Sequence, residues 1–203
     1  QTKIITLDVC NKLEVERLNN LPDGWKKIDV LINNAGLSLG LDPINEGNTS
    51  DWDIMIDTNI KGLLYVTKII SGWMVEHKSG HIINIGSIAG KETYAKGNVY
   101  CATKHAVDSL NKAMRIDLLA HGIRVTAIHP GAVETEFSEV RFKGDKERAQ
   151  KVYEGFDPLL SKDIAEAICF VITRPVHVNI NDMVIMPTAQ ASTTYLTSYG
   201  LKD

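Results

Sequence analysis

The sequence predicts an α/β fold built on a parallel sheet. Short runs rich in β-branched residues alternate with longer helical patterns along the 203 residues. The helical patterns are long enough to serve as the crossovers that parallel strands need, whereas hairpins would need only tight turns. Most of the strand-like runs end in small or polar residues, and ligands bind at the carboxyl edge of such sheets. Together these observations favour an open sheet with a binding site along that edge.

Five runs are expected as strands: residues 3–9, 29–33, 81–86, 124–129 and 183–186. Between them, helical patterns cover residues 11–20, 50 to about 77, 97 to about 121, and 161–173. Ser50 and Ser161 stand where N-caps are expected, each followed by Asp within three residues. Gly80 and Gly122 follow the two long helices and are expected to end them.

Residues 138–157 form a charge-rich stretch with weak patterning. Two interpretations of this stretch stay open. It is either a solvated surface excursion or a mobile lid, because long irregular segments in compact domains are often functional.

Composition and charge exclude several classes of function. Lys and Arg number 22 against 25 Asp and Glu, which gives a net charge of −3 and no basic field for nucleic acid. The longest apolar stretches fall well short of the roughly 20 residues that a membrane-spanning helix needs. Three scattered cysteines without a C-x-x-C pair fit neither a disulfide framework nor a zinc site. We therefore expect a reducing compartment and a cytoplasmic protein.

No metal site is expected from the histidines. His77 and His81 are four residues apart, but Gly80 separates a helix end from a strand start, so the two need not share a face. The other histidines are scattered and receive no role: His105, His121, His129 and His177.

The pattern that carries chemistry is Tyr100-x-x-x-Lys104, within the helix expected over residues 97–121. Residues four apart stack on one helical face, so the phenol and the ammonium project into the same space. A free tyrosine has a pKa of about 10, and a neighbouring cation lowers this pKa by stabilising the phenolate. Such a pair is suited to general acid and base catalysis. The spacing alone is equally compatible with coincidence.

Other features accompany this pair, most of them at predicted strand ends. Taken singly, each is an ordinary capping or turn residue, except for an Asn inside a helix, where Asn is mildly unfavourable. In chain order they are Asn33-Asn34-Ala35-Gly36, Asn59, Ser87 and Pro130-Gly131. With the Tyr/Lys pair, the set resembles the classical short-chain dehydrogenase/reductase family, from about residue 7 to residue 186. Within that family the chain is most similar to the NADP-dependent 3-hydroxy acid (serine, allo-threonine) dehydrogenases.

The resemblance implies a Rossmann-like, doubly wound sheet and an oxidoreductase that transfers a hydride between NADP(H) and a small 3-hydroxy acid. Tyr100 would be the general acid and base. Lys104 would lower the pKa of Tyr100 and hold the ribose hydroxyls, while Ser87 would hydrogen-bond the substrate oxygen. Asn59 would anchor a water molecule that connects Lys104 to solvent.

The resemblance also implies nucleotide contacts, with NADP expected and NAD not excluded. The residues that it assigns to the cofactor are Asp8, Val9, Asn34, Ala35, Gly36, Tyr100, Lys104, Pro130, Gly131, Val133 and Thr135. The substrate would meet Ser87, Tyr100 and Arg141. The last of these is our own hypothesis, because a hydroxy acid needs a cation for its carboxylate and a guanidinium is a suitable bidentate partner. Lys143 is the rival.

The family's first two strands, its first helix and its Gly-rich turn have no counterpart in this sequence, which starts near the family's third strand. We therefore expect residues 1–203 to be a single, N-terminally incomplete dinucleotide-binding catalytic domain. In the family's strand order, 3-2-1-4-5-6-7, the missing strands would lie between runs 3–9 and 29–33. We expect that these residues alone form no stable, cofactor-binding enzyme, since unpaired backbone groups would face the gap.

Two functional alternatives stay open. One is the enzyme, with a small hydroxy acid or carbonyl substrate. The other is a non-catalytic remnant of the family or an interaction module without full nucleotide binding. The long helices carry more apolar residues than one sheet face requires, and family members pair through them, so a homodimer or homotetramer is expected.

Overall fold

The main sheet has four parallel strands in a computed structural model that describes residues 2–197. Along the sheet they are β1 (Val30–Asn33), β2 (Gly80–Ile85), β3 (Ile123–Pro130) and β6 (Asp182–Ile185). Two short strands, β4 (Val133–Glu134) and β5 (Leu159–Leu160), pair with each other in a separate parallel ladder. The parallel sheet and four of the five expected strands are therefore confirmed.

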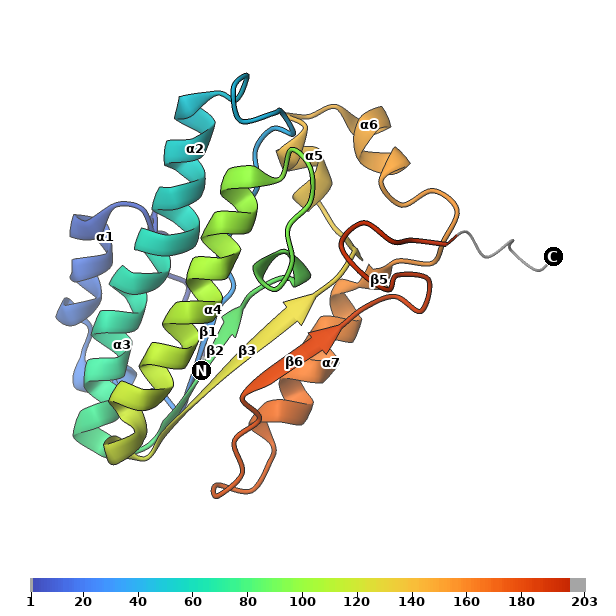
Figure 1. Cartoon of the computed structure of the whole chain (residues 1–203). Helices are drawn as coiled ribbons and strands as arrows, with labels where there is room; N and C mark the ends of the chain where they lie inside the picture. The colour runs from blue at the N-terminus through green and yellow to red at the C-terminus, as the bar shows by residue number, and fades with distance from the viewer. Residues whose placement is uncertain (1, 198–203) are drawn as a thin grey trace.

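Helices cover both faces of the sheet, which makes the fold doubly wound and Rossmann-like (Figure 1). The longest helices, α3 and α4, pack on one face, and α7 packs on the other. The helices are α1 (Lys12–Glu16), α2 (Thr49–Ile56), α3 (Leu63–His77), α4 (Asn98–Leu118), α5 (Phe137–Arg141), α6 (Lys146–Lys151) and α7 (Ser161–Ile172). One-turn 3-10 helices are formed by Arg17–Asn20, Asp23–Trp25, Ile88–Gly90 and Leu119–His121.

The core follows from the two-residue period of the strands. Successive side chains of β2 point to opposite faces, so Ile82 joins the core under α3 and α4 while Ile83 joins the core under α7. Both side chains are fully buried. A central strand covered by helices on both faces is therefore apolar without alternation, which explains why these runs were recognisable as strands.

The strand expected at residues 3–9 is wrong. The segment is irregular, and Ile4 and Ile5 are 89% and 42% exposed. A cavity of about 500 Å³ is lined by residues of this segment together with Glu14, Arg17 and Leu18. A strand requires a hydrogen-bonded neighbour, and among residues 2–197 no strand lies next to this segment. The β-branched residues give this segment a propensity for the extended conformation, but they do not provide the neighbouring strand with which it would pair.

The first long helical pattern is confirmed in extent but not in regularity. Between α2 and α3 the chain forms a π-helical segment, Asp57–Gly62. Insertions of this kind are frequent at functional sites because they turn side chains out of the regular helical order. Asn59 lies within this segment.

The predicted helix caps are partly wrong. The N-cap of α2 is Asn48, whose side chain accepts hydrogen bonds from the backbone N–H groups of Ser50 and Asp51. At the C-terminal end of α3, Lys78 takes the left-handed conformation, and Gly80 begins β2 instead of ending the helix. Gly122, at φ 70°, ends the helix after α4 as expected.

The charge-rich stretch at 138–157 contains all of α5 but its first residue, together with α6, and both helices lie beyond the carboxyl ends of the strands in Figure 1. A Lys143–Asp51 ion pair of 2.8 Å connects it to α2. The stretch is therefore held against the rest of the chain, and its mobility stays a prediction. No helix among residues 2–197 is both long enough and apolar enough to cross a bilayer.

Candidate active site

Tyr100 and Lys104 lie in the first two turns of α4, at the carboxyl edge of the sheet. Both side chains are buried, at 7% and 6% exposure. The Lys104 ammonium lies 6.0 Å from the centre of the Tyr100 ring, and it donates a 3.0 Å hydrogen bond to the carbonyl of Ile85, the last residue of β2. The predicted pair therefore shares one helix face at the end of a strand.

Burial dominates the electrostatics of this pair. It raises the pKa of Tyr100 above its ordinary value, while the nearby Ser87 side chain and the charge of Arg141 act in the opposite direction. Burial lowers the pKa of Lys104 to about 8. The expected lowering of the Tyr100 pKa by Lys104 stays a prediction. The groups that favour the phenolate are Ser87 and Arg141.

Ser87 follows β2 and caps the 3-10 turn Ile88–Gly90. Its hydroxyl oxygen accepts a 3.1 Å hydrogen bond from the backbone N–H of Ala89, which leaves the hydroxyl proton free to be donated. The turn interpretation of Ser87 is thus correct, and the same turn directs its side chain to Tyr100.

Asn59 has a clear structural role. Its side-chain oxygen accepts from the N–H of Leu37, and its amide nitrogen donates to the carbonyl of Leu37, both at 2.8 Å. The amide nitrogen also donates to the Thr103 hydroxyl at 3.0 Å. Asn59 therefore ties the loop after β1 to α4 in the interior, and its side-chain oxygen keeps one lone pair for a further donor.

The loop after β1 runs directly beside the catalytic candidates. Asn34, Ala35 and Gly36 are exposed at the carboxyl end of β1. A side chain at Gly36 would place its Cβ 3.2 Å from the Asn59 side-chain oxygen and 3.5 Å from the Lys104 ammonium. Glycine thus lets the backbone approach these two groups with no side chain between them. Asn33 is structural, since its amide donates to Thr67 and Asn84 side chains at 2.9 Å each.

The other cofactor candidates divide into two groups. Asp8 is exposed, and Val9 packs against the backbone of Gly62 in the π-helical segment. Pro130 is buried at the end of β3, while Gly131 and Val133 are half-buried and Thr135 is exposed. A side chain at Gly131 would collide with the Gln190 side-chain oxygen. The structure places the second group at the sheet edge that holds Tyr100, and Asp8 near the start of α1.

Arg141, the last residue of α5, points into the same site. Its guanidinium carbon lies 5.1 Å from the centre of the Tyr100 ring and 5.0 Å from that of Phe137. Its Nε donates to Ser38 at 3.1 Å, and a terminal nitrogen donates to the Tyr94 hydroxyl at 2.9 Å. Burial raises the pKa of Tyr94 to about 12, so that hydroxyl is neutral. Neither side-chain partner carries a charge that balances the guanidinium.

Ser38 and Tyr94, which hold Arg141, were not among the predicted site residues, and His129 was expected to have no role. Ser38 is buried and stands alone in a loop, so no pattern marks it. Tyr94 is an aromatic residue just ahead of the Tyr100 helix, which is a usable but weak signal. His129 precedes Pro130-Gly131 on β3 and reaches the carbonyl of Ser87 at 3.2 Å.

The sequence and the fold are similar to those of known proteins. Residues 1–146 match the family described as short chain dehydrogenase. The NADP-dependent 3-hydroxy acid dehydrogenase YdfG of Salmonella typhi is 52% identical over 187 residues, or 91% of this chain and 75% of that protein. The NADP-dependent 3-hydroxy acid dehydrogenase of Schizosaccharomyces pombe is 42% identical over 179 residues, or 88% of this chain and 69% of that protein.

A solved structure is similar over most of the fold. The closed form of serine dehydrogenase complexed with NADP+ aligns with a TM-score of 0.90 and 47% sequence identity. The alignment covers 96% of this chain and 79% of that one.

Proposed function

The chain belongs to the short-chain dehydrogenase family, and from that premise we propose that this oxidoreductase transfers a hydride between NADP(H) and a small 3-hydroxy acid. One observation carries the proposal. Tyr100, Lys104 and Ser87 meet at the carboxyl edge of the sheet, with the Arg141 guanidinium beside the Tyr100 ring. The two relatives described above, at 52% and 42% identity, are named for NADP and for 3-hydroxy acids, which supports the choice of cofactor and substrate.

The residues present fit a bound dinucleotide. Lys104 is a buried cation whose side-chain hydrogen bond goes to a single carbonyl, so it retains donors for ribose hydroxyls. Because Gly36 has no side chain, none comes between the loop after β1 and this ammonium. Asn34, Ala35 and Gly36 would hold the nucleotide from the end of β1, and Pro130 to Thr135 would hold it from the end of β3, as ligands bind in such sheets. When bound, NADP(H) supplies or accepts the hydride.

The chain's own residues supply the proton and the positioning. In the direction of oxidation, Tyr100 takes the proton of the substrate hydroxyl at its phenolic oxygen, and in reduction it returns that proton. Ser87 donates a hydrogen bond to the same substrate oxygen and stabilises the charge that develops there. The Lys104 ammonium orients the nucleotide. Asn59 fixes the loop at Leu37, and its free lone pair accepts a hydrogen bond from a water molecule on the way to solvent.

Arg141 is the proposed partner of the substrate carboxylate, and Lys143 is the weaker rival. Lys143 is already paired with Asp51 at 2.8 Å. Arg141 is half-buried beside Tyr100 and bonded to neutral hydroxyls, so its charge is available to an anion. The acid specificity of the enzyme would reside in this guanidinium.

Substituting Arg141 by Met is expected to raise KM for a 3-hydroxy acid about 10- to 100-fold, because one charge-assisted contact is lost. KM for a neutral alcohol of the same chain length stays within about two-fold of the wild-type value, which controls for damage to the pocket. Lys143→Met serves as the matched cation control and leaves the acid KM unchanged. An Arg141→Met enzyme with the wild-type KM for the acid would remove Arg141 from the substrate site.

The function itself is tested by binding and turnover. NADPH fluorescence is followed on addition of the protein, and NADPH formation is then measured with L-serine and 3-hydroxypropionate. We expect binding of NADPH and turnover of at least one acid when the chain is joined to the Gly-rich nucleotide-binding segment typical of the family, with NAD(H) measured in parallel. Residues 1–203 alone are expected to show neither. The non-catalytic alternative predicts neither binding nor turnover, so this pair of measurements separates the two.

The assembly and the location stay proposals. Ile116 and Leu119 are 76% and 74% exposed at the end of α4 and the turn that follows it. Large apolar side chains in such positions support the expected homodimer or homotetramer. The cytoplasmic location remains an expectation from the cysteine pattern.

A further inference from the structure

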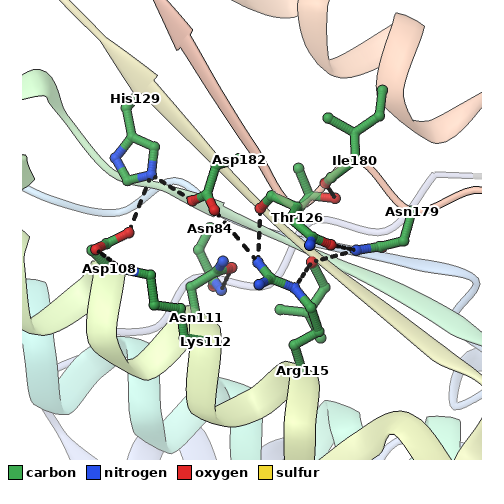
Figure 2. A network of polar contacts seen from close by, with 12 residues as sticks. Asn84, Asp108, Asn111, Lys112, Arg115, Thr126, His129, Asn179, Ile180 and Asp182 are labelled. Atoms are coloured by element: carbon green, nitrogen blue, oxygen red, sulfur yellow. Dashed lines mark hydrogen bonds and ion pairs between the residues drawn. The ribbon is translucent and has the colours of Figure 1, made fainter.

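A polar cluster, buried apart from Asp182, lies directly behind the candidate active site. It joins His129 at the end of β3, Asp108 on α4 and Asp182 on β6 (Figure 2). His129 is fully buried, and its Nε2 lies 3.2 Å from Asp182 and 3.6 Å from Asp108. Its Nδ1 lies 3.2 Å from the backbone carbonyl of Ser87. The imidazole therefore bridges the acidic pair and the turn that carries a proposed catalytic hydroxyl.

The two carboxylates are already balanced by protein cations. The Lys91 ammonium lies 2.6 Å from Asp108 and 3.4 Å from Asp182. Lys112 pairs with the second Asp108 oxygen at 2.7 Å. The three groups bring ligand atoms within 4.8 Å of one another, but the ammonium of Lys91 already bonds both carboxylates. The geometry thus favours an orienting network over a metal centre.

The His129 imidazole packs closely against the backbone at Gly86 and Ser87. A Cβ at Gly86 would collide with the His129 ring, so glycine at this position lets the ring approach the backbone. The Ser87 carbonyl accepts from His129 and also from the Gly90 N–H at 2.8 Å. Both bonds fix the orientation of the peptide that follows Ser87, and with it the direction of the Ser87 side chain.

We propose that His129 is a positioning residue for the reaction, which holds the Ser87 turn through a hydrogen bond from Nδ1 while Asp182 and Asp108 orient the ring from behind. The inference rests on the proposed function, because it concerns the aim of the Ser87 hydroxyl at the substrate. The Ser87 carbonyl and the Asp182 carboxylate both only accept, so the two bonds together require a hydrogen on each ring nitrogen, that is, the imidazolium form. Burial and the Lys91 charge lower the pKa of His129, whereas the bonds to Asp182 and Ser87 and the Asp108 charge act in the opposite direction. His129 does not touch substrate or nucleotide.

Two amide substitutions of His129 test the contacts of its two ring nitrogens separately. The amide nitrogen of His129→Asn occupies the place of Nδ1 and donates to the Ser87 carbonyl. The longer His129→Gln places its amide near Nε2, next to Asp182, and leaves that carbonyl without this donor. We expect kcat of His129→Gln to fall about ten-fold, and kcat of His129→Asn to stay at least about five-fold above it.

A matched control comes from His81 on β2. This histidine is also buried, and its Nε2 lies 2.8 Å from the Thr126 hydroxyl, away from Ser87. His81→Asn and His81→Gln are expected to have equal kcat values, even where their melting temperatures differ. Equal kcat for the two His129 variants, or kcat values that simply follow Tm across all four variants, would overturn the proposal.

A second pair of variants tests the proposal if the His129 variants fail to fold. Asp182 is partly exposed, so Asp182→Asn and Asp182→Ala are better tolerated. Asn retains an acceptor for Nε2–H, whereas Ala does not. We expect kcat of the Ala variant to lie about three-fold below that of the Asn variant, and equal values would contradict an orienting role. Wild-type enzyme without turnover would instead refute the proposed function, so the two failures are distinguishable.

Discussion

Replacing Tyr100 with phenylalanine is expected to lower kcat/KM by about 10² to 10⁴, the range for loss of a positioned general acid or base. The change removes one hydroxyl from a buried ring and keeps the ring's contact with Phe137, whose centre lies 5.6 Å away. NADPH affinity is therefore expected to stay within about two-fold of wild type. Initial rates with a 3-hydroxy acid, together with NADPH fluorescence titration, measure both quantities.

Tyr65→Phe is the matched control for this substitution. Tyr65 is a partly buried tyrosine on α3 that packs against the core and lies outside the site. Its variant is expected to keep the wild-type rate. A Tyr100→Phe enzyme that retains more than about a tenth of the wild-type kcat/KM would show that another group moves the proton.

Strands that are buried on both faces of the sheet were predictable from the sequence. Runs such as 81–86 lie between helices on both faces, and their continuous apolar character follows directly from that position. The run 3–9 is also rich in β-branched residues and forms no strand, because pairing depends on a neighbour that local sequence does not reveal. Propensity is a property of the segment, whereas pairing is a property of the sheet.

The helical part of the site was predictable for a similar reason. Tyr100 and Lys104 are four residues apart on one helix, and helical geometry alone places them on the same face. Asn59 was recognisable as unusual within a helix. Its π-helical setting and its bonds to Leu37 were not, because both depend on the packing of the loop after β1.

The contacts that orient the site were beyond sequence reasoning. Arg141 is held by Ser38, which is 103 residues away in the chain, and by Tyr94, which is 47 residues away. His129 reaches Asp182 across 53 residues. No periodicity links such positions, since only the assembled sheet and its loops bring them together. The pKa of Tyr100 depends in part on the charge of Arg141, which such contacts bring beside it.

Substituting Lys104 by Met is expected to abolish most of the activity and yet stabilise the protein at pH 7. The activity, as kcat/KM, falls about 100-fold or more because the nucleotide and Tyr100 lose their cation. The pKa of Lys104 falls from 10.5 to about 8 through burial, which corresponds to about 3 kcal/mol against the charged form at 1.36 kcal/mol per pKa unit. Loss of the bond to Ile85 offsets part of this, so a net gain of about 1–2 kcal/mol is expected.

The stability difference between the wild type and Lys104→Met is expected to depend on pH. Between pH 8 and 10.5 the unfolded chain binds a proton at Lys104 that the folded chain does not, so the stability of the wild type rises with pH across this window. The Met variant lacks that rise, and its advantage, measured by urea unfolding without added nucleotide, therefore shrinks as pH increases. Lys112→Met on the same helix is the contrast, because pairing with Asp108 raises the pKa of Lys112, and its removal brings no stabilisation at pH 7. If Lys104→Met were less stable than wild type at pH 7, the ammonium would have to be compensated within the fold, and Lys104 would no longer be a cation held ready for the nucleotide.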